Sequence, residues 1–271
     1  MADPGPPQNA YVEANRTHWE QLVADHPDIE SADSVEAFLD GDSALLPVQR
    51  DEMGSVAGKS LIDLQSHLGV RTLSWARAGA TVTGVDISAE SVAVARALAA
   101  EAGLADRARF IRANVLDLPA THDERYDVVV TNFGVLCWLP DLDAWASVVA
   151  ELLKPGGVFY LAEHHPVATA LSDDLGADDD PITVENPYFS TETPATPGDE
   201  PPHKWTHGLG EILTALIEAG VDLEFVHEHP FSVIQRAPEM VQADDGTWRF
   251  DSDVDLPLLV TVKGTRRSDD G

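Results

Sequence analysis

This sequence is poor in cysteine and has no long apolar run. Its 271 residues include one cysteine, Cys137, which excludes an intrachain disulfide framework and favours a reducing cytoplasm. A transmembrane helix needs about 18 consecutive apolar residues, and no such run occurs. The opening residues also lack the basic and apolar regions of a signal peptide. We therefore expect a cytoplasmic location.

Positive charge is also scarce. Lys and Arg number 17 against 47 Asp and Glu, which gives a formal net charge of −30. Proteins that bind nucleic acids or anionic membranes use basic surfaces. This chain has few basic residues, so neither partner is expected. The apolar content of 44% indicates a folded protein rather than an acidic disordered chain. These features favour a small-molecule partner.

The acidity favours a salt-adapted protein. Acidic residues are spread along the whole chain, and their mutual repulsion opposes a compact state. Molar salt shortens the Debye length to about 3 Å and removes most of this cost. The composition resembles cytoplasmic proteins of halophiles that accumulate salt. An ordinary acidic mesophilic protein is the alternative.

Short apolar runs alternate with amphipathic helices from residue 59 onward, which is typical of a βαβ sheet. Strands are expected at 60–64, 81–86, 108–113, 126–131 and 158–163, and helices at 69–78, 88–103 and around 145–152. A later helix at 209–217 precedes strands near 222–229 and 256–264. No clear helix separates these last two strands, so they are expected as an antiparallel pair at one sheet edge. A dinucleotide dehydrogenase would continue with parallel units instead.

Two segments flank this pattern. Residues 9–26 have the apolar spacing of a helix, and residues 1–55 are expected to form an N-terminal helical cover over a domain at 56–271. Residues 164–207 hold seven prolines and nine acids in 44 positions, too polar for a packed element. Such an insertion is usually a lid or a solvated loop. We expect a lid that covers the ligand with the 9–26 helix; an insertion that never touches ligand is the alternative.

Acidic residues end the first two expected strands. Asp63 closes the first strand and Asp86 the second. Ligands of open α/β sheets bind at the carboxyl ends of strands, where an acid on the second strand can accept hydrogen bonds from ribose hydroxyls. The turn after the first strand reads Asp63-Leu-Gln-Ser-His-Leu-Gly69. We therefore place the site at this edge.

This turn, with Gly-Val-Asp-Ile-Ser88 and Leu-Lys-Pro-Gly-Gly157, resembles class I S-adenosylmethionine-dependent methyltransferases over about residues 59–165. The resemblance implies an α/β fold with a Rossmann-like seven-stranded methyltransferase sheet, helices on both faces and S-adenosylmethionine as cofactor. The chain departs from the family's glycine-rich motif, because Gln65 and His67 stand where two glycines are expected. It is similar in this respect to a subgroup with a Leu-Gln-Cys-His-Phe-Gly turn and a Cys-Trp-Leu-Pro-Asp segment, which Cys137–Asp141 match.

The resemblance assigns roles near the cofactor. The methionine portion would lie near Asp63 and Gly69, and the ribose would bind Asp86. Gln65 and His67 would contact the cofactor or only hold the turn. The adenine would pack on Ile87 and lie near Asn114 and Val115, and the floor beneath the sulfonium would comprise Thr131 and Asn132.

Histidines offer a candidate proton acceptor. His164 and His165 follow the strand at 158–163 and so should face the ligand crevice, where a neutral imidazole could take a proton from a hydroxyl or amine. Loop histidines without a chemical task are the alternative. The ten histidines show no zinc-ligand spacing, and no metal is expected. An acceptor pocket is expected from the aromatic and imidazole side chains of Tyr11, Trp19, Trp138, Tyr188 and His207, although such residues often only pack.

These observations favour a methyltransferase that acts on a small molecule. Methyl transfer from a sulfonium is an in-line displacement that needs no metal, and holding the reacting atoms in line supplies much of the catalysis. A catalytically silent binding protein of the same fold is the alternative. A nicotinamide oxidoreductase is disfavoured, because Gly-x-Gly-x-x-Gly is absent.

Overall fold

The computed structural model describes residues 8–25, 34–171, 184–190, 202–251 and 256–268. Its main feature is a seven-stranded sheet with the order β3-β2-β1-β4-β5-β9-β6. The strands, in chain order, are β1 (Ser60–Leu64), β2 (Thr81–Asp86), β3 (Ala108–Arg112), β4 (Tyr126–Thr131), β5 (Leu153–His164), β6 (Val221–His229) and β9 (Leu259–Arg266). The predicted Rossmann-like methyltransferase sheet is confirmed.

Burial on both faces explains why the central strands are continuous apolar runs. In β1, Leu61 packs into the cluster on one face of the sheet and Ile62 into the cluster on the other, and neither is exposed. The β1–β5 strands pair in parallel, whereas β9 runs antiparallel to both β5 and β6. This antiparallel arrangement at one edge was predicted from the missing helix between the last two strands.

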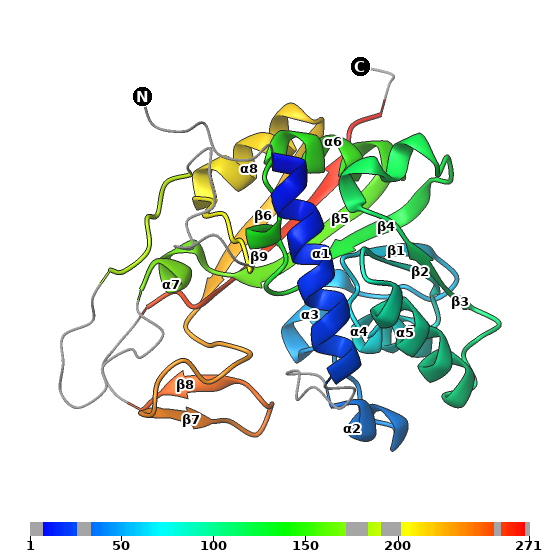
Figure 1. The fold of residues 1–271 in the computed structure, drawn as a ribbon, viewed down its shortest axis with the longest axis horizontal. Helices are drawn as coiled ribbons and strands as arrows, with labels where there is room; N and C mark the ends of the chain where they lie inside the picture. Colours follow the sequence, from blue (N-terminus) through cyan, green and yellow to red (C-terminus); the bar gives the residue numbers. More distant parts are fainter. Residues whose placement is uncertain (1–7, 26–33, 172–183, 191–201, 252–255, 269–271) are drawn as a thin grey trace.

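Helices cover both faces of the sheet, as Figure 1 shows. Trp145 and Ile212 anchor α6 (Leu142–Leu152) and α8 (Leu209–Glu218) to one face, and Trp75 anchors α4 (Val70–Arg77) to the other. Next to α4 lies α5 (Ala89–Glu101), whose N-cap Ser88 accepts a hydrogen bond from the Ser91 amide as predicted. Shorter elements are α2 (Val35–Leu39), α3 (Pro47–Met53), α7 (Pro166–Ala170) and the 3₁₀ turns η1 (Val115–Ala120) and η2 (Leu136–Trp138).

Strand order fixes where a ligand can bind. The chain leaves β1 to form β2 on one side and returns to form β4 on the other, so the loops after β1 and β4 part at this point. Such a switch point leaves a crevice at the carboxyl ends of the strands. The helix α1 (Gln8–Asp25) runs across the front of the sheet (Figure 1) and confirms the predicted helix at 9–26.

The structure also has elements that the sequence did not suggest. A hairpin of β7 (Met240–Gln242) and β8 (Trp248–Phe250) stands apart from the main sheet (Figure 1), in the stretch that showed no clear pattern. Strand β5 begins at Leu153, five residues earlier than expected, because Lys154-Pro-Gly-Gly157 extends the strand beyond a register shift against β4. Neither difference alters the position of the crevice.

Candidate cofactor and acceptor site

A cavity of about 270 Å³ lies at the carboxyl ends of β1, β2 and β4. Nine of the ten predicted cofactor positions line it, namely Asp63, Gln65, His67, Gly69, Asp86, Ile87, Asn114, Val115 and Asn132. The exception is Thr131, which is fully buried within β4 and does not reach the cavity wall. The strand-end acids and the family resemblance therefore predicted residues that the fold brings together, and their roles stay predictions.

The turn after β1 keeps a glycine-like backbone without the glycines. Gln65 and His67 have φ angles of 60° and 48°, and they are the non-glycine residues with positive φ among those the structure describes. Gly69, the remaining glycine of the motif, has φ of 78° and begins α4. Left-handed backbone costs a non-glycine residue about 1–2 kcal/mol. Strain of this kind clusters at ligand-binding turns, where the surrounding structure can maintain it.

Asp86 is held by backbone amides at the end of β2. The amide of His67 donates to Oδ2 at 2.8 Å and that of Ser88 to Oδ1 at 2.9 Å. Burial raises the pKa of Asp86 to about 6, although these amide hydrogen bonds oppose the rise. Each carboxylate oxygen retains a lone pair, so Asp86 can still accept hydrogen bonds from a ligand diol.

A buried polar chain forms the floor between β1 and β4. The Asn132 side-chain amide donates to Asp63 at 2.9 Å, and the Thr72 hydroxyl donates to the second carboxylate oxygen at 2.6 Å. Gln49 of α3 in turn donates to the Asn132 carbonyl at 3.0 Å. This network fixes Asp63 and Asn132 in one orientation. Sequence reasoning missed Gln49, because only folding brings α3 to the strand ends.

Helix α1 closes one side of the cavity. Four of its residues, Val12, Asn15, Arg16 and Trp19, line the wall. The Trp19 ring meets the His67 ring edge-on at 5.4 Å and the Trp138 ring at 5.2 Å. The helix thus contacts both loops that bound the crevice.

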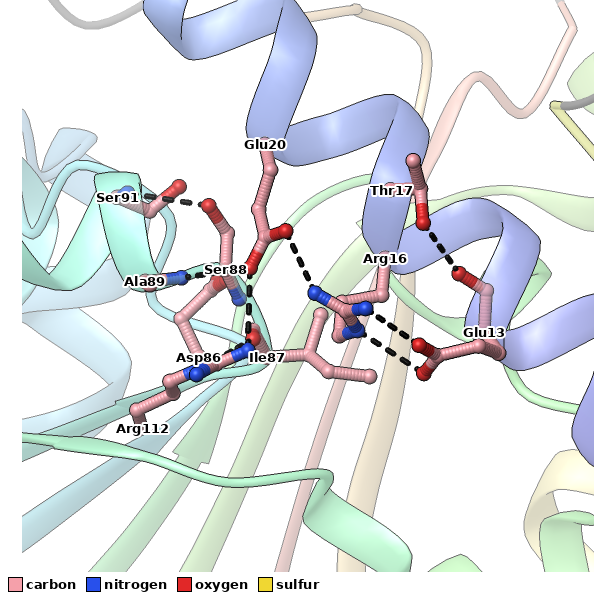
Figure 2. A network of polar contacts seen from close by, with 10 residues as sticks. All are labelled: Glu13, Arg16, Thr17, Glu20, Asp86, Ile87, Ser88, Ala89, Ser91 and Arg112. Carbon is pink, nitrogen blue, oxygen red and sulfur yellow. Dashed lines mark hydrogen bonds and ion pairs between the residues drawn. The ribbon is translucent and has the colours of Figure 1, made fainter.

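An ionic network fastens α1 at the mouth of the cavity, next to Asp86 (Figure 2). Arg16 pairs with Glu13 and Glu20 on its own helix. Glu20 also accepts from Arg112, at the end of β3, at 3.1 Å. These contacts connect the cover to the strands that carry the ribose-side residues.

A strap of residues 202–207 holds α1 from the other side. The Asn15 side chain donates to the carbonyl of His203 and accepts from its amide, both at 2.7 Å. The strap also reaches the loop after β4, since the Trp205 amide donates to the Cys137 carbonyl at 2.8 Å. Tyr11 packs on the rings of His203 and Trp205 rather than in the cavity wall.

The lid at 164–207 stays a prediction, because much of this segment lies outside the described residues. In the parts of 166–206 that the structure describes, no residue lines the cavity; residues 172–183 and 191–201 lie outside those parts. Tyr188 accepts a hydrogen bond from the Leu209 amide, and His207 bonds the Leu139 carbonyl at 2.8 Å, so neither faces the cavity. The strap supports α1 from behind instead.

The far end of the cavity has a different lining. It comprises the side chains or backbone of Arg71, Phe133, Gly134, Trp138, Leu139, His164, Val233 and Ile234. Trp138 and His164 were predicted. Arg71, Val233 and Ile234 were missed, because the last two follow β6 and reach the site only through the late strand pair. An apolar wall with a few polar groups is typical of small-molecule pockets.

The two candidate proton acceptors differ in their surroundings. Burial, together with the charges of Arg236, Arg71 and Lys204, lowers the pKa of His164 to about 3. His164 is therefore neutral near pH 7 and a weak base. His165 lies outside the cavity, since its Nδ1 accepts from the Val167 amide at the start of α7 and its Nε2 lies 2.9 Å from Glu228. It serves as a helix cap, which corrects its assignment to the crevice.

Glu163 shapes the loop that follows β4. Its buried carboxylate accepts from the amides of Gly134, Val135 and Leu136, the last two at 2.9 and 3.1 Å, and from its neighbour His164 at 2.7 Å. Burial raises the pKa of Glu163 despite these hydrogen bonds. The side chain thereby fixes the loop that presents Phe133 and Trp138 to the cavity. Sequence reasoning missed Glu163, and the feature that could have indicated it is its position near the end of β5.

Comparison with known proteins agrees with this geometry. Residues 62–157, from β1 into β5, match the family model described as "Methyltransferase domain". This part of the chain is a class I S-adenosylmethionine-dependent methyltransferase domain, and it contains all ten of the predicted cofactor positions. In the described residues, no helix is long and apolar enough to cross a bilayer. Nor do three or more His, Cys, Asp or Glu side chains gather there as a metal site would require.

Individual relatives cover different parts of the molecule. The Ubiquinone biosynthesis O-methyltransferase of Klebsiella pneumoniae is 38% identical over 111 residues, 41% of this chain and 45% of that protein. The chain thus matches less than half the length of these curated relatives. A solved S-adenosylmethionine-dependent methyltransferase from Mesorhizobium loti aligns over 84% of this chain and 100% of its own, with a TM-score of 0.63 and 25% identity. Geranyl diphosphate C-methyltransferase from Streptomyces coelicolor, at 15% identity, TM-score 0.59 and coverage of 97% and 100%, shows likeness of fold alone.

Proposed function

We propose that this protein transfers a methyl group from S-adenosylmethionine to a small-molecule acceptor. The observation that carries the proposal is the cavity at the ends of β1, β2 and β4, where Asp86 and the strained turn lie on one wall. The Klebsiella relative is named as an O-methyltransferase, which favours an oxygen atom as acceptor. We place the reaction in the cytoplasm, on the strength of the single cysteine.

The residues that line the cavity fit the cofactor. Gln65 Oε1 and His67 Nε2 are buried and have no hydrogen-bond partner among the described residues. Buried polar atoms normally have partners, so these two fit a polar ligand held against the turn. Gln65 has a fixed orientation, because its Nε2 donates to the Val135 carbonyl at 3.0 Å. Its oxygen can therefore accept from a ligand N–H group.

The protein's contribution would be binding and alignment. Bound S-adenosylmethionine supplies the methyl group on a sulfonium. Asp86 would accept hydrogen bonds from the ribose hydroxyls, and Ile87 would pack on the adenine, with Asn114 beside it. Asp63 and Asn132, held by Thr72 and Gln49, would form the floor at the methionine end. This alignment brings the acceptor atom into line with the methyl carbon, the main source of rate in such a displacement.

A proton acceptor plays a smaller part in this proposal. His164 lines the cavity, but its low pKa makes it suited to hydrogen bonding rather than to removing a proton near pH 7. The acceptor would therefore react as an anion or through a neutral lone pair. We propose that residues 1–55 act as a cover on a domain spanning 56–271, with α1 excluding water from the reacting atoms.

Calorimetric titration with S-adenosylhomocysteine tests the proposal. We expect binding by the wild type, no binding of NAD, and a loss of at least tenfold in affinity for Asp86→Ala. The loss follows from removing a charged hydrogen-bond acceptor, worth about 1.5–3 kcal/mol per bond. Asp106→Ala, at an exposed turn, is the matched control and should bind normally.

Two results would contradict the proposal. Unchanged affinity in Asp86→Ala would remove the ribose assignment. Binding of S-adenosylhomocysteine without transfer of label from methyl-labelled S-adenosylmethionine to any compound in a broad acceptor panel would favour the catalytically silent protein of the same fold.

A further inference from the structure

The predicted adenine end of the cavity opens into a second hollow, which lies between the first half of α1, η1 and the start of α6. The two hollows share five lining residues, which we call the neck: Val12, Arg16, Ile87, Ala113 and Asn114. The first two belong to α1, whereas the other three follow β2 and β3. A ligand that reaches the adenine end of the cavity therefore lies between the helical cover and the strand ends.

The Arg16 guanidinium has carboxylates on its rim. Its Nε donates to Glu13 at 2.9 Å, one terminal nitrogen donates to the second Glu13 oxygen, and the other donates to Glu20 at 2.5 Å. All of these donors lie in the plane of the group. Figure 2 shows Arg16 extending from α1 toward Ile87, between Glu13 and Glu20. The carboxylates thus compensate the charge and fix the plane, and these in-plane bonds do not occupy its flat faces.

The neck offers a flat ring mainly stacking contacts. Guanidinium faces stack on aromatic rings and on nucleobases, and Val12, Ile87 and Ala113 add apolar surface. Asn114, predicted beside the adenine, is partly engaged within the protein. Its oxygen accepts from the Leu116 amide at 3.2 Å, and its nitrogen donates to Asp117 at 3.1 Å. Half of its hydrogen-bonding capacity is therefore already used.

We propose that Arg16 binds the adenine ring of the cofactor by stacking on the face opposite Ile87. Helix α1 then forms part of the cofactor site and does more than cover it. The ring lies in the neck, with Ile87 on the strand side and the guanidinium on the helix side. Glu13 and Glu20 are positioning residues, because they fix the plane of the guanidinium. This inference rests on the proposed methyltransferase function, since it adds a contact to the same cofactor.

A purely structural role for Arg16 is the competing explanation, and the pairing pattern disfavours it. Both ion pairs of Arg16 lie within α1, whereas the pair that joins this network to the strands is that of Glu20 with Arg112. Pairs within one helix stabilise it little, and they form equally well on its solvent-facing side. Arg16 instead lines both hollows, and only 23% of its side chain is exposed. This placement fits contact with a ligand.

Calorimetry with S-adenosylhomocysteine separates stacking from ion pairing. Arg16→Ala removes both, Arg16→Lys keeps the charge without a flat face, and Arg16→Tyr restores a flat face without the charge. We expect the affinity to fall at least tenfold in Arg16→Ala and Arg16→Lys, and Arg16→Tyr to bind at least three times more tightly than Arg16→Ala. Arg77→Ala is the matched control and should bind normally, because Arg77 also stacks on a ring, that of Phe38 at 3.7 Å, but lines neither hollow.

A ligand without the base tests the same contact from the other side. S-ribosylhomocysteine has the ribose and homocysteine of S-adenosylhomocysteine and a hydroxyl group in place of adenine. Its affinity is measured by displacement of S-adenosylhomocysteine. Arg16→Ala should leave this affinity within twofold of the wild type, because the stacking partner is absent. Asp86→Ala should weaken it, since the ribose is still present.

Three results would overturn the stacking role. Wild-type affinity in Arg16→Lys would show that ion pairing is sufficient. Equal affinity of Arg16→Tyr and Arg16→Ala would show that a flat face contributes nothing. Equal losses for both ligands in Arg16→Ala would show that Arg16 acts only through the position of α1. Failure of the wild type to bind S-adenosylhomocysteine would instead remove the proposed function. Melting temperatures near that of the wild type show that the variants are folded.

Discussion

At the scale of single residues, the turn after β1 carries strain in two side-chain-bearing residues. Gln65 and His67 hold backbone angles that glycine adopts without cost, yet both present buried polar atoms to the cavity. A protein selected for stability alone would keep glycine here. The strain is retained at a turn that lines the cavity, which indicates that the side chains of Gln65 and His67 contribute to ligand binding.

Paired substitutions at Gln65 separate strain from side-chain function. We expect Gln65→Gly to be more stable than Gln65→Ala by about 1 kcal/mol, because only glycine relieves the positive φ. Both variants should lose affinity for S-adenosylhomocysteine, since both lack the amide. Chemical denaturation and calorimetry measure the two effects. Ser66, whose φ is not positive, provides the control: Ser66→Ala should be more stable than Ser66→Gly. Equal stability of the two Gln65 variants would argue against strain.

Asp86 should make cofactor affinity depend on pH. Its pKa is raised to about 6, and the ionised form is the better acceptor for ribose hydroxyls. Affinity for S-adenosylhomocysteine should therefore be full above pH 7 and fall as the pH drops through 6. Titrations between pH 5 and 8 measure this. Asp86→Asn should bind weakly with a flat profile; His67, with its pKa lowered to about 4, stays neutral over this range. A flat wild-type profile would contradict the assignment.

Sequence reasoning located site residues that depend on local position. Asp63 and Asp86 end the first two strands, so the strand pattern alone places them at one edge, whereas Asn114 and Asn132 were assigned from the family resemblance. Arg71 was missed although it lies two residues after Gly69, because nothing in the sequence tells which side of α4 meets the cavity. His165 was misassigned, since adjacent residues at a strand end point in different directions.

At the scale of elements, α1 depends on contacts with distant segments. Asn15 is buried, with 5% of its surface exposed, and makes both of its hydrogen bonds to His203, 188 residues away. The strap in turn binds the loop after β4. Cover, strap and loop therefore act as one unit over the cavity.

Asn15→Ala should loosen this unit. It leaves the buried amide and carbonyl of His203 without their partner, at a cost of about 1–3 kcal/mol for each group. We expect faster deuterium exchange of α1 amides and faster dissociation of S-adenosylhomocysteine, measured by mass spectrometry and stopped flow. Thr17→Ala, on the exposed side of α1, should behave as wild type. An unchanged dissociation rate in Asn15→Ala would show that α1 does not control access.

The elements that could be predicted are those with strong local signals. β1, β2 and β4 have the bounds expected from apolar runs, and α5 begins at its expected cap. The hairpin of β7 and β8 was missed because its strands are only three residues long, too short for an alternating pattern to show in the sequence. The role of the strap could not be inferred, since it depends on pairing across most of the chain.

At the scale of the whole molecule, the charge of −30 predicts salt-dependent stability. Exposed ion pairs such as that of Arg267 with Asp222 engage only a minority of the carboxylates, so repulsion remains. We expect the melting temperature to rise between low and molar KCl as this repulsion is screened. Scanning calorimetry measures the rise. Neutralising the exposed Glu101, Asp106 and Asp123 to their amides should reduce its slope. A flat or falling curve would count against salt adaptation.

The position of β9 has a consequence for biosynthesis. β9 lies between β5 and β6, although it is made after both. While the ribosome is still producing residues before 259, β6 has no neighbour in the main sheet, and the edge of β5 is uncovered. Unpaired strand edges on a nascent chain are prone to association with other chains. The second half of this protein should therefore need protection by chaperones until β9 emerges and pairs with both β5 and β6.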